Sequence, residues 1–269
     1  MKRSGLISVK IMVRCMFVVT LSVIILSGIS ARVKADEADA KRILKAMSDY
    51  MAAEQMISFG FDATLEVVTT DGQKLGLASS GTLNLNRPGK IFFTRTGGIA
   101  DIELLFDGKM LTLLGKNLNV YTQLEVPGTL DHLVDELRNT YNRPLPAADL
   151  LLSNSYDELM LDVIDVKDLG AGVVGGVVCD HLAFRKTDVD WQIWIAQGKE
   201  PYPCRYVITS TQLNSGPQYT IQFRDWRTGG EVAAVDYSFN NKTNAGKVDL
   251  KDLKGADDMP DNFKKGESK

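Results

Sequence analysis

The sequence predicts an α+β protein whose main element is a curved antiparallel sheet of about 9–11 strands covered by helices. Two observations lead to this prediction. Short segments of alternating apolar and polar residues follow one another along most of the chain, separated by glycine-rich turns. Two stretches have a helical spacing of apolar residues instead, one before the first strand and one between two groups of strands, and these could cover the sheet.

The first 35 residues have the composition of a secretory signal peptide. A basic start without acidic residues precedes a nearly apolar run of 15 residues, Cys15–Ile29, and Val33 and Ala35 follow it. Because crossing a bilayer takes about 20 apolar residues, this run is short for a membrane anchor. We therefore expect a signal peptide over residues 1–35, cleavage after Ala35, and a mature chain in the periplasm without a transmembrane segment.

The mature chain is predicted to be acidic. Six of the 31 lysines and arginines, and none of the 34 acidic residues, lie within residues 1–35, which leaves a net charge of about −9. An acidic chain without a basic block repels phosphate backbones, so we expect no nucleic acid partner. The same charge gives no attraction to anionic membrane surfaces.

The mature chain begins with a predicted helix over Asp36–Met56, with acidic residues in its first turn. From Phe61 the period changes to two, as expected for a half-buried strand, and Asp71-Gly72 is a hairpin turn. Further strands with short connections predict an antiparallel meander. These strands are Leu75–Leu85, Lys90–Thr96, Ala100–Phe106, Met110–Leu114 and Val120–Leu124.

A helical insert follows Pro127-Gly128. Thr129 is a suitable N-cap, and a second short helix is predicted over Ala147–Leu152. The apolar stripe of the first insert helix is Leu130, Leu133, Val134, Leu137 and Tyr141. Four more strands follow: Val177–Lys186, Val189–Gln197, Cys204–Gln212 and Gln218–Trp226. Since neither group of strands would be stable alone, we expect one domain.

A large sheet with one apolar face must be covered, and only the two helical stretches are available as covers. A curved sheet closed in this way predicts an apolar ligand pocket, with an ordinary filled core as the alternative. If the insert is a lid, Leu133 and Leu137 face the concave sheet. The opposing wall is then expected to consist of Phe61, Leu65, Phe92, Leu104, Trp191, Ile193, Ile208 and Phe223.

The mature chain contains two cysteines, Cys179 and Cys204, and in an oxidising compartment these suggest one disulfide. Simple strand register places both in one row with Ile195, two strands or about 9.6 Å apart, beyond the ~7 Å that a disulfide spans. A bulge or a curled strand end would have to join them. We favour the disulfide, because an exported chain has few other uses for two thiols, and a buried thiol pair is the alternative.

The sequence contains little that indicates catalysis. The one local cluster with a nucleophile, an acid and an imidazole is Cys179-Asp180-His181. On a strand, Asp180 faces away from the other two and could not orient His181. No further ligands stand at a spacing usual for metals, and no serine hydrolase motif occurs. We expect no catalytic residues, no metal and no cofactor, and we expect His132 to be a solvated helix residue.

Several stretches resemble known families. The run Ser80–Phe93 is similar to the strand, R-P-x-K, strand signature of the lipoprotein carriers LolA and LolB, and Leu105–Leu111 and Leu118–Tyr121 resemble their next hairpin. Three later stretches resemble a family of predicted periplasmic proteins of unknown function that shares the carrier fold: Cys179–Arg185, Asp190–Ile195 and Pro201–Thr209.

The composition of residues 264–269 predicts a loose tail, and before it the resemblance implies a single LolA/LolB-like half-barrel domain over residues 36–263. It also implies a concave side that holds acyl chains under a helical lid. The leading hypothesis is therefore a non-enzymatic carrier or sensor for an apolar small molecule, a lipid or a lipoprotein acyl chain. The alternatives are a filled-core module that acts on another envelope protein and an unrecognised hydrolase.

Overall fold

The computed structural model of the protein describes residues 36–98, 100–141 and 145–250. The predicted signal peptide and the expected tail over 264–269 lie outside the described residues. A helix over residues 36–53 precedes the first strand, and Met56 already belongs to that strand, so the helix ends earlier than predicted. None of the helices within the described ranges is long and apolar enough to cross a membrane.

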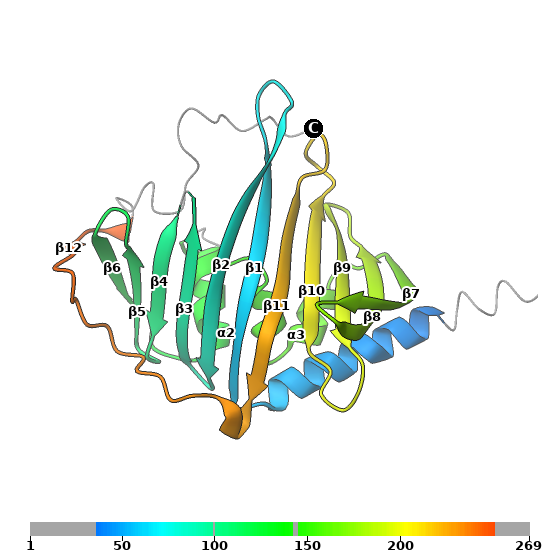
Figure 1. The fold of residues 1–269 in the computed structure, drawn as a ribbon, viewed down its shortest axis with the longest axis horizontal. Helices are drawn as coiled ribbons and strands as arrows, with labels where there is room; N and C mark the ends of the chain where they lie inside the picture. The colour runs from blue at the N-terminus through cyan, green and yellow to red at the C-terminus, as the bar shows by residue number, and fades with distance from the viewer. Residues whose placement is uncertain (1–35, 99, 142–144, 251–269) are drawn as a thin grey trace, which may run out of the picture.

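One sheet of twelve strands organises these residues (Figure 1). The strands and helices are β1 (Met56–Val68), β2 (Lys74–Asn86), β3 (Lys90–Gly97), β4 (Asp101–Phe106), β5 (Met110–Gly115), β6 (Val120–Glu125), α2 (Leu130–Asn139), η1 (Ala148–Leu151), α3 (Ser155–Met160), β7 (Asp165–Val174), β8 (Val177–Arg185), β9 (Val189–Ala196), β10 (Pro203–Ser210), β11 (Gln218–Thr228), η2 (Gly229–Glu231) and β12 (Gly246–Lys247).

The sheet consists of two antiparallel meanders joined at their middle. Its strand order is β12-β6-β5-β4-β3-β2-β1-β11-β10-β9-β8-β7, so the first and last long strands pair with each other. In that pairing Phe61 lies opposite Phe223 and Ala63 opposite Ile221. The sheet stays open, with β7 at one edge and the short parallel strand β12 at the other. The predicted α+β fold with an open, curved antiparallel sheet is thus confirmed.

The sequence analysis missed two strands. β12 is only two residues long, too short to leave a pattern. β7 was missed because Gly170 and Gly172 interrupt it, and because its register against β8 shifts between Asp168 and Ala171. Twelve strands therefore exceed the predicted range by one.

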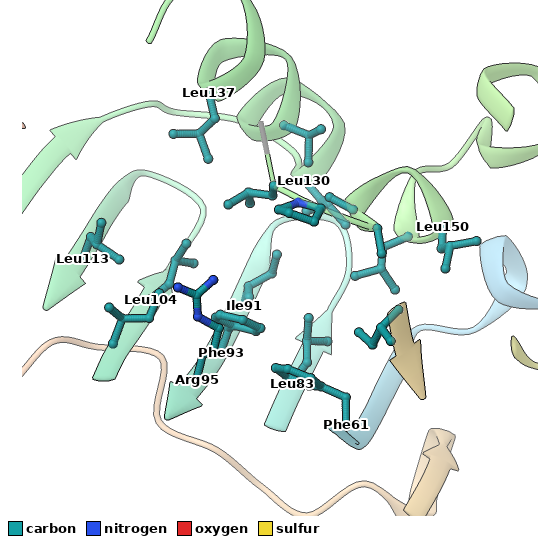
Figure 2. Close-up of a pocket in the computed structure, with 18 of the residues that line it drawn as sticks. Phe61, Leu83, Ile91, Phe93, Arg95, Leu104, Leu113, Leu130, Leu137 and Leu150 are labelled. Carbon is teal, nitrogen blue, oxygen red and sulfur yellow. The ribbon is translucent and has the colours of Figure 1, made fainter. Parts of the chain in front are cut away.

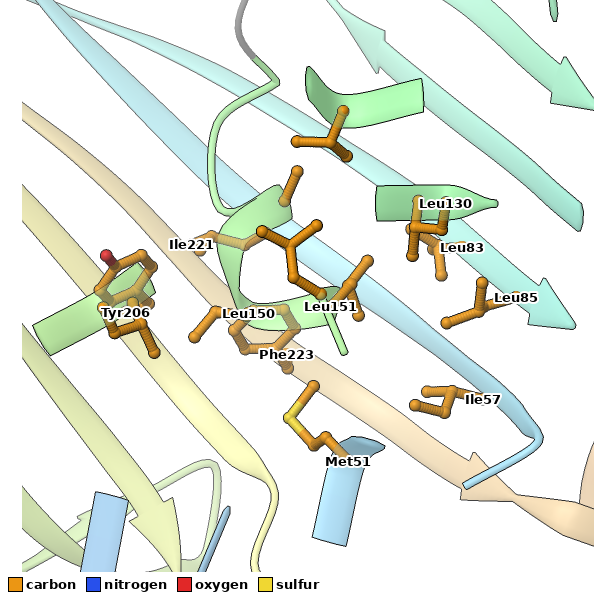
Figure 3. Packing of buried hydrophobic residues seen from close by; sticks show 14 of the residues in the cluster. Met51, Ile57, Leu83, Leu85, Leu130, Leu150, Leu151, Tyr206, Ile221 and Phe223 are labelled. Atoms are coloured by element: carbon orange, nitrogen blue, oxygen red, sulfur yellow. The ribbon is translucent and has the colours of Figure 1, made fainter. Parts of the chain in front are cut away.

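A continuous apolar core lies against one face of the sheet. The N-terminal helix runs along the β7–β11 half of the sheet in Figure 1. It buries four side chains in this core: Ala40, Leu44, Met47 and Met51. Near the middle of the sheet, Leu150 and Leu151 of η1 lie against Ile221 and Phe223 (Figure 3). Burying each such side chain stabilises the fold by about 1.5–3 kcal/mol.

Candidate ligand-binding site

A cavity of about 550 Å³ lies between the sheet and the helical insert (Figure 2). Its floor comes mainly from β1–β5 and β11, and its roof from α2 and from residues 145–151. The lining side chains include Phe59, Phe61, Leu83, Ile91, Phe93, Ile102, Leu104, Leu111, Leu113, Leu124, Leu130, Val134, Leu137, Tyr219, Ile221, Phe223 and Trp226. Cavities of about 300–1,000 Å³ with mostly apolar walls are the usual size for small-molecule sites.

Helix α2 forms the roof because its sequence fixes both its start and its buried face. The Thr129 side chain caps the helix by accepting a hydrogen bond from the backbone N–H of His132 at 3.3 Å, as predicted. Four of the five stripe residues, Leu130, Leu133, Val134 and Leu137, are buried. Three of them line the cavity, whereas Leu133 packs into the core. His132 is exposed, as predicted.

Arg87, in the turn between β2 and β3, ties the roof to the N-terminal helix. Its guanidinium group donates to the backbone carbonyl oxygen of Leu151 at 2.8 Å. It also donates to the carbonyls of Met51 at 3.3 Å and Glu54 at 3.2 Å, at the end of the N-terminal helix. Carbonyls at helix ends lack helical partners, so one arginine satisfies groups on both covers of the sheet.

A buried carboxyl group anchors the roof segment to the other half of the sheet. The Tyr206 hydroxyl on β10 donates to Oδ2 of Asp149 on η1 at 3.3 Å. Burial raises the pKa of Asp149, against the opposing effects of this hydrogen bond and of the charges of Arg138 and Lys186. Burial, and then the charge of Asp149, raises the pKa of Tyr206 well above its usual value.

The structure brings four of the ten predicted wall and lid residues together at the cavity: Phe61, Leu104, Leu137 and Phe223. Leu133, Trp191 and Ile193 are fully or almost fully buried in the core outside the cavity lining, and Ile208 packs against that core half-buried. Leu65 shares the face of Phe61 but is 45% exposed.

Phe92 was assigned to the wrong face of the sheet. Its neighbours Ile91 and Phe93 line the cavity, and successive side chains of a strand point to opposite faces, so Phe92 lies on the convex side. The register contains the signal that was overlooked. Leu83 and Leu85 of β2 pair with Phe93 and Ile91, and directly paired residues share a face, whereas Phe92 pairs with Asn84.

Both cysteines are free, buried thiols, so the structure does not contain the disulfide favoured from the sequence. A bulge of the kind that the register argument required lies at Cys204. The pairing of β9 with β10 shifts between Pro203 and Arg205, which places an extra residue, Cys204, at a bulge. The two thiols lie in one small buried cluster, and burial, followed by the influence of Cys179, raises the pKa of Cys204.

The Cys179-Asp180-His181 cluster lacks the features of a nucleophilic site. Burial raises the pKa of Cys179, whereas an activated thiol needs a lowered one. The His181 ring stacks on Trp194 with ring centroids 3.9 Å apart and hydrogen-bonds to Oε1 of Gln192 at 2.9 Å. Within the described part of the chain, no group of three or more potential metal ligands comes together.

The fold and the site together define a class of protein, an open antiparallel half-barrel with a helical cover over an apolar cavity. The chain belongs to the DUF2092 family of predicted periplasmic proteins, whose family model matches residues 40–251. The family resemblance and the periplasmic location predicted from the sequence are thereby confirmed. The sequence matches no curated protein.

Several solved structures are similar to this chain at low identity. LprF from Mycobacterium bovis is 13% identical, with 76% of this chain and 99% of LprF covered and a TM-score of 0.46. A chain of the Pseudomonas aeruginosa MucA/MucB complex is 14% identical, with 75% and 61% covered and a TM-score of 0.43. A LolA superfamily protein from Nitrosomonas europaea is 11% identical, with 74% and 97% covered and a TM-score of 0.35.

Proposed function

We propose that this protein is a periplasmic, non-enzymatic binding protein that holds an apolar ligand, a lipid or acyl chain, in the cavity between its sheet and its insert. It acts as a carrier or sensor for that ligand. The observation that carries the proposal is the cavity of about 550 Å³ with a mostly apolar lining. A filled core at this place would have favoured an interaction module instead.

The lining explains why the ligand is apolar. Hydrocarbon transferred from water into such a cavity contributes about 0.8 kcal/mol for each buried methylene group. Aromatic rings give the cavity a defined shape, since Phe61 and Phe93 stack with centroids 5.5 Å apart. The hydrogen bond from Arg87 to Leu151 also gives the roof a connection that can break when the insert moves to admit a ligand.

The test is the binding of a fluorescent fatty-acid probe to the mature protein. Leu113→Trp places an indole in the cavity, and we expect it to weaken probe binding by about tenfold or more, or ~1.4 kcal/mol. The matched control is Leu169→Trp, at a side chain of β7 that is 49% exposed. This variant is expected to bind the probe like the wild type. A wild-type protein that neither binds the probe nor carries a lipid when purified from the periplasm would refute the proposal.

A second candidate function is the binding of another envelope protein at the edge strand β7. Large apolar side chains lie exposed on and beside this edge: Leu161, Ile164, Leu169, Val173 and Val178. Exposed apolar groups of this kind are typical of interaction surfaces. A photo-crosslinker at Val173 should then capture one defined periplasmic partner, whereas the same group at exposed Leu118 should not; equal labelling at both positions would exclude the candidate.

A further inference from the structure

Arg95 is the one charged side chain among the described residues that line the cavity. The remaining polar side chains there are the hydroxyl-bearing Thr122, Tyr141 and Tyr219, apart from the indole of Trp226. A guanidinium group facing hydrocarbon is costly unless an anion or several acceptors compensate it. Arg95 interacts within the chain, and its guanidinium is the cationic group that a ligand in this cavity would meet.

The fold directs Arg95 into the cavity. It alternates along β3 with Ile91 and Phe93, both of which line the cavity, and its partner on β4 is the lining residue Ile102. Its partner on β2 is Gly81. A larger residue there would clash, because its Cβ atom would lie 2.6 Å from the Phe61 ring. Figure 2 shows the Arg95 side chain beside Phe93 and Leu104.

The two ends of β3 differ. Near Ile91 the start of α2 is held against the turn before β3, because the backbone N–H of Leu130 donates to the Pro88 carbonyl at 2.7 Å. Arg95 lies toward the opposite end of the strand and is only half-buried. An elongated ligand would thus place its apolar chain under α2 and its polar end at Arg95.

Tyr219 lies within electrostatic reach of Arg95. Burial raises the pKa of Tyr219 to about 12, and the positive charge of Arg95 opposes this rise. At neutral pH the hydroxyl is therefore a hydrogen-bond donor beside a permanent cation. A cation and a neutral donor together suit the oxygen atoms of an anion.

We propose that the ligand is an anionic amphiphile whose carboxylate or phosphate group binds Arg95 while its acyl chain fills the cavity. The inference rests on the proposed function, since it specifies the ligand class of the same site. Arg95 already interacts within the chain, so the headgroup would share or replace that interaction. The guanidinium offers five N–H donors for this purpose.

The experiment measures how hexadecanoate, hexadecyl phosphate and the uncharged hexadecanol displace a neutral fluorescent probe from the mature protein. Because a hydrogen bond to a charged group is worth about ten- to a hundredfold in affinity, we expect at least one anion to bind about tenfold more tightly than hexadecanol. The stronger of the two anions identifies the headgroup as a carboxylate or a phosphate.

The Arg95→Gln variant should lose this preference, measured as the ratio of anion to hexadecanol affinity within the same variant, and Arg95→Lys should retain most of it. The matched control, Arg227→Gln, removes an exposed arginine of β11 and should behave like the wild type. Equal binding of anions and hexadecanol by the wild type would overturn the inference and leave the proposed function intact. Failure of the wild type to bind the probe or any of the three ligands would overturn both.

Discussion

The two halves of the sheet carry the same alternating pattern but different interiors. In the β7–β10 half, the Phe184 and Trp191 rings stack with centroids 3.9 Å apart, and Tyr206 meets Trp191 edge-on at 5.8 Å. In the β1–β6 half, rings of the same kind line a cavity of about 550 Å³. The covered face of the sheet is apolar in both halves, so composition does not explain why one interior is filled and the other contains a cavity.

The difference comes from the covers. Leu44 and Met47 of the N-terminal helix are completely buried in the same core as Trp191. Over the other half, α2 approaches with Leu130, Val134 and Leu137, and these side chains border the cavity without filling it. A sheet face becomes filled core or cavity wall according to how closely its helix packs.

The largest expected effect tests this comparison directly. Trp191→Ala should cost about 3–5 kcal/mol of unfolding free energy, because the ring is almost completely buried among close neighbours. Phe93→Ala should cost less, since the half-buried Phe93 ring already borders empty space, but it should weaken ligand binding. Urea denaturation and probe binding measure the two effects. Equal stability losses would show that the two halves are packed alike.

The cysteine pair lies in the β7–β10 half, outside the cavity lining. Because Cys179 and Cys204 lie in the same small buried cluster, we expect them to form a disulfide in the oxidising periplasm. The bond should stabilise the protein by about 2–4 kcal/mol, seen as a fall in Tm on reduction that a Cys179→Ser/Cys204→Ser variant lacks. Two free thiols in denatured, air-exposed protein would contradict this prediction. Ligand affinity should not change.

Arg87 joins the covers of the two halves, so its removal should loosen both. Arg87→Met leaves the carbonyls of Leu151, Met51 and Glu54 without this donor. We expect a loss of about 1–3 kcal/mol in unfolding free energy, measured by urea denaturation, and faster probe dissociation. Arg227→Met is the exposed control, and equal losses in both variants would argue against a specific role for Arg87.

The sheet could be predicted from the sequence because turns such as Asp71-Gly72 and the period-two pattern are local signals. Gly72 indeed adopts a positive φ of 87°. The insert helix could be predicted for the same reason, from Thr129 and its apolar stripe. β7 could not, because Gly170 and a register shift break its pattern.

The cavity wall was predicted only in part. Trp191 and Phe61 have the same local pattern, and only the packing distance of a helix remote in sequence separates core from wall. Arg95 was missed because a charged residue at the end of an alternating strand resembles an ordinary solvent-facing position. Its direction becomes evident only from its register with Ile102 and Gly81.

The smallest expected effect concerns Asp149, which lies on η1 between the two halves and contacts Tyr206. Burial raises the pKa of this carboxyl in the folded protein. The unfolded chain therefore releases the proton more readily, and the wild type loses stability as the pH rises from about 3.8 through the raised pKa. Arg138 and Lys186 are the cations that oppose this effect.

Asp149→Asn keeps an acceptor for the Tyr206 hydroxyl but cannot ionise. Its stability relative to the wild type should therefore rise with pH across this window, by about 1.4 kcal/mol for each unit by which the pKa is raised. Urea denaturation of both proteins between pH 4 and 8 measures the difference, and subtracting the curves cancels the other carboxyl groups, such as Asp190, whose pKa the Arg185 hydrogen bond lowers. A constant difference would mean that Asp149 titrates alike in the folded and unfolded chain, and the junction between the filled and hollow halves would then be insensitive to pH.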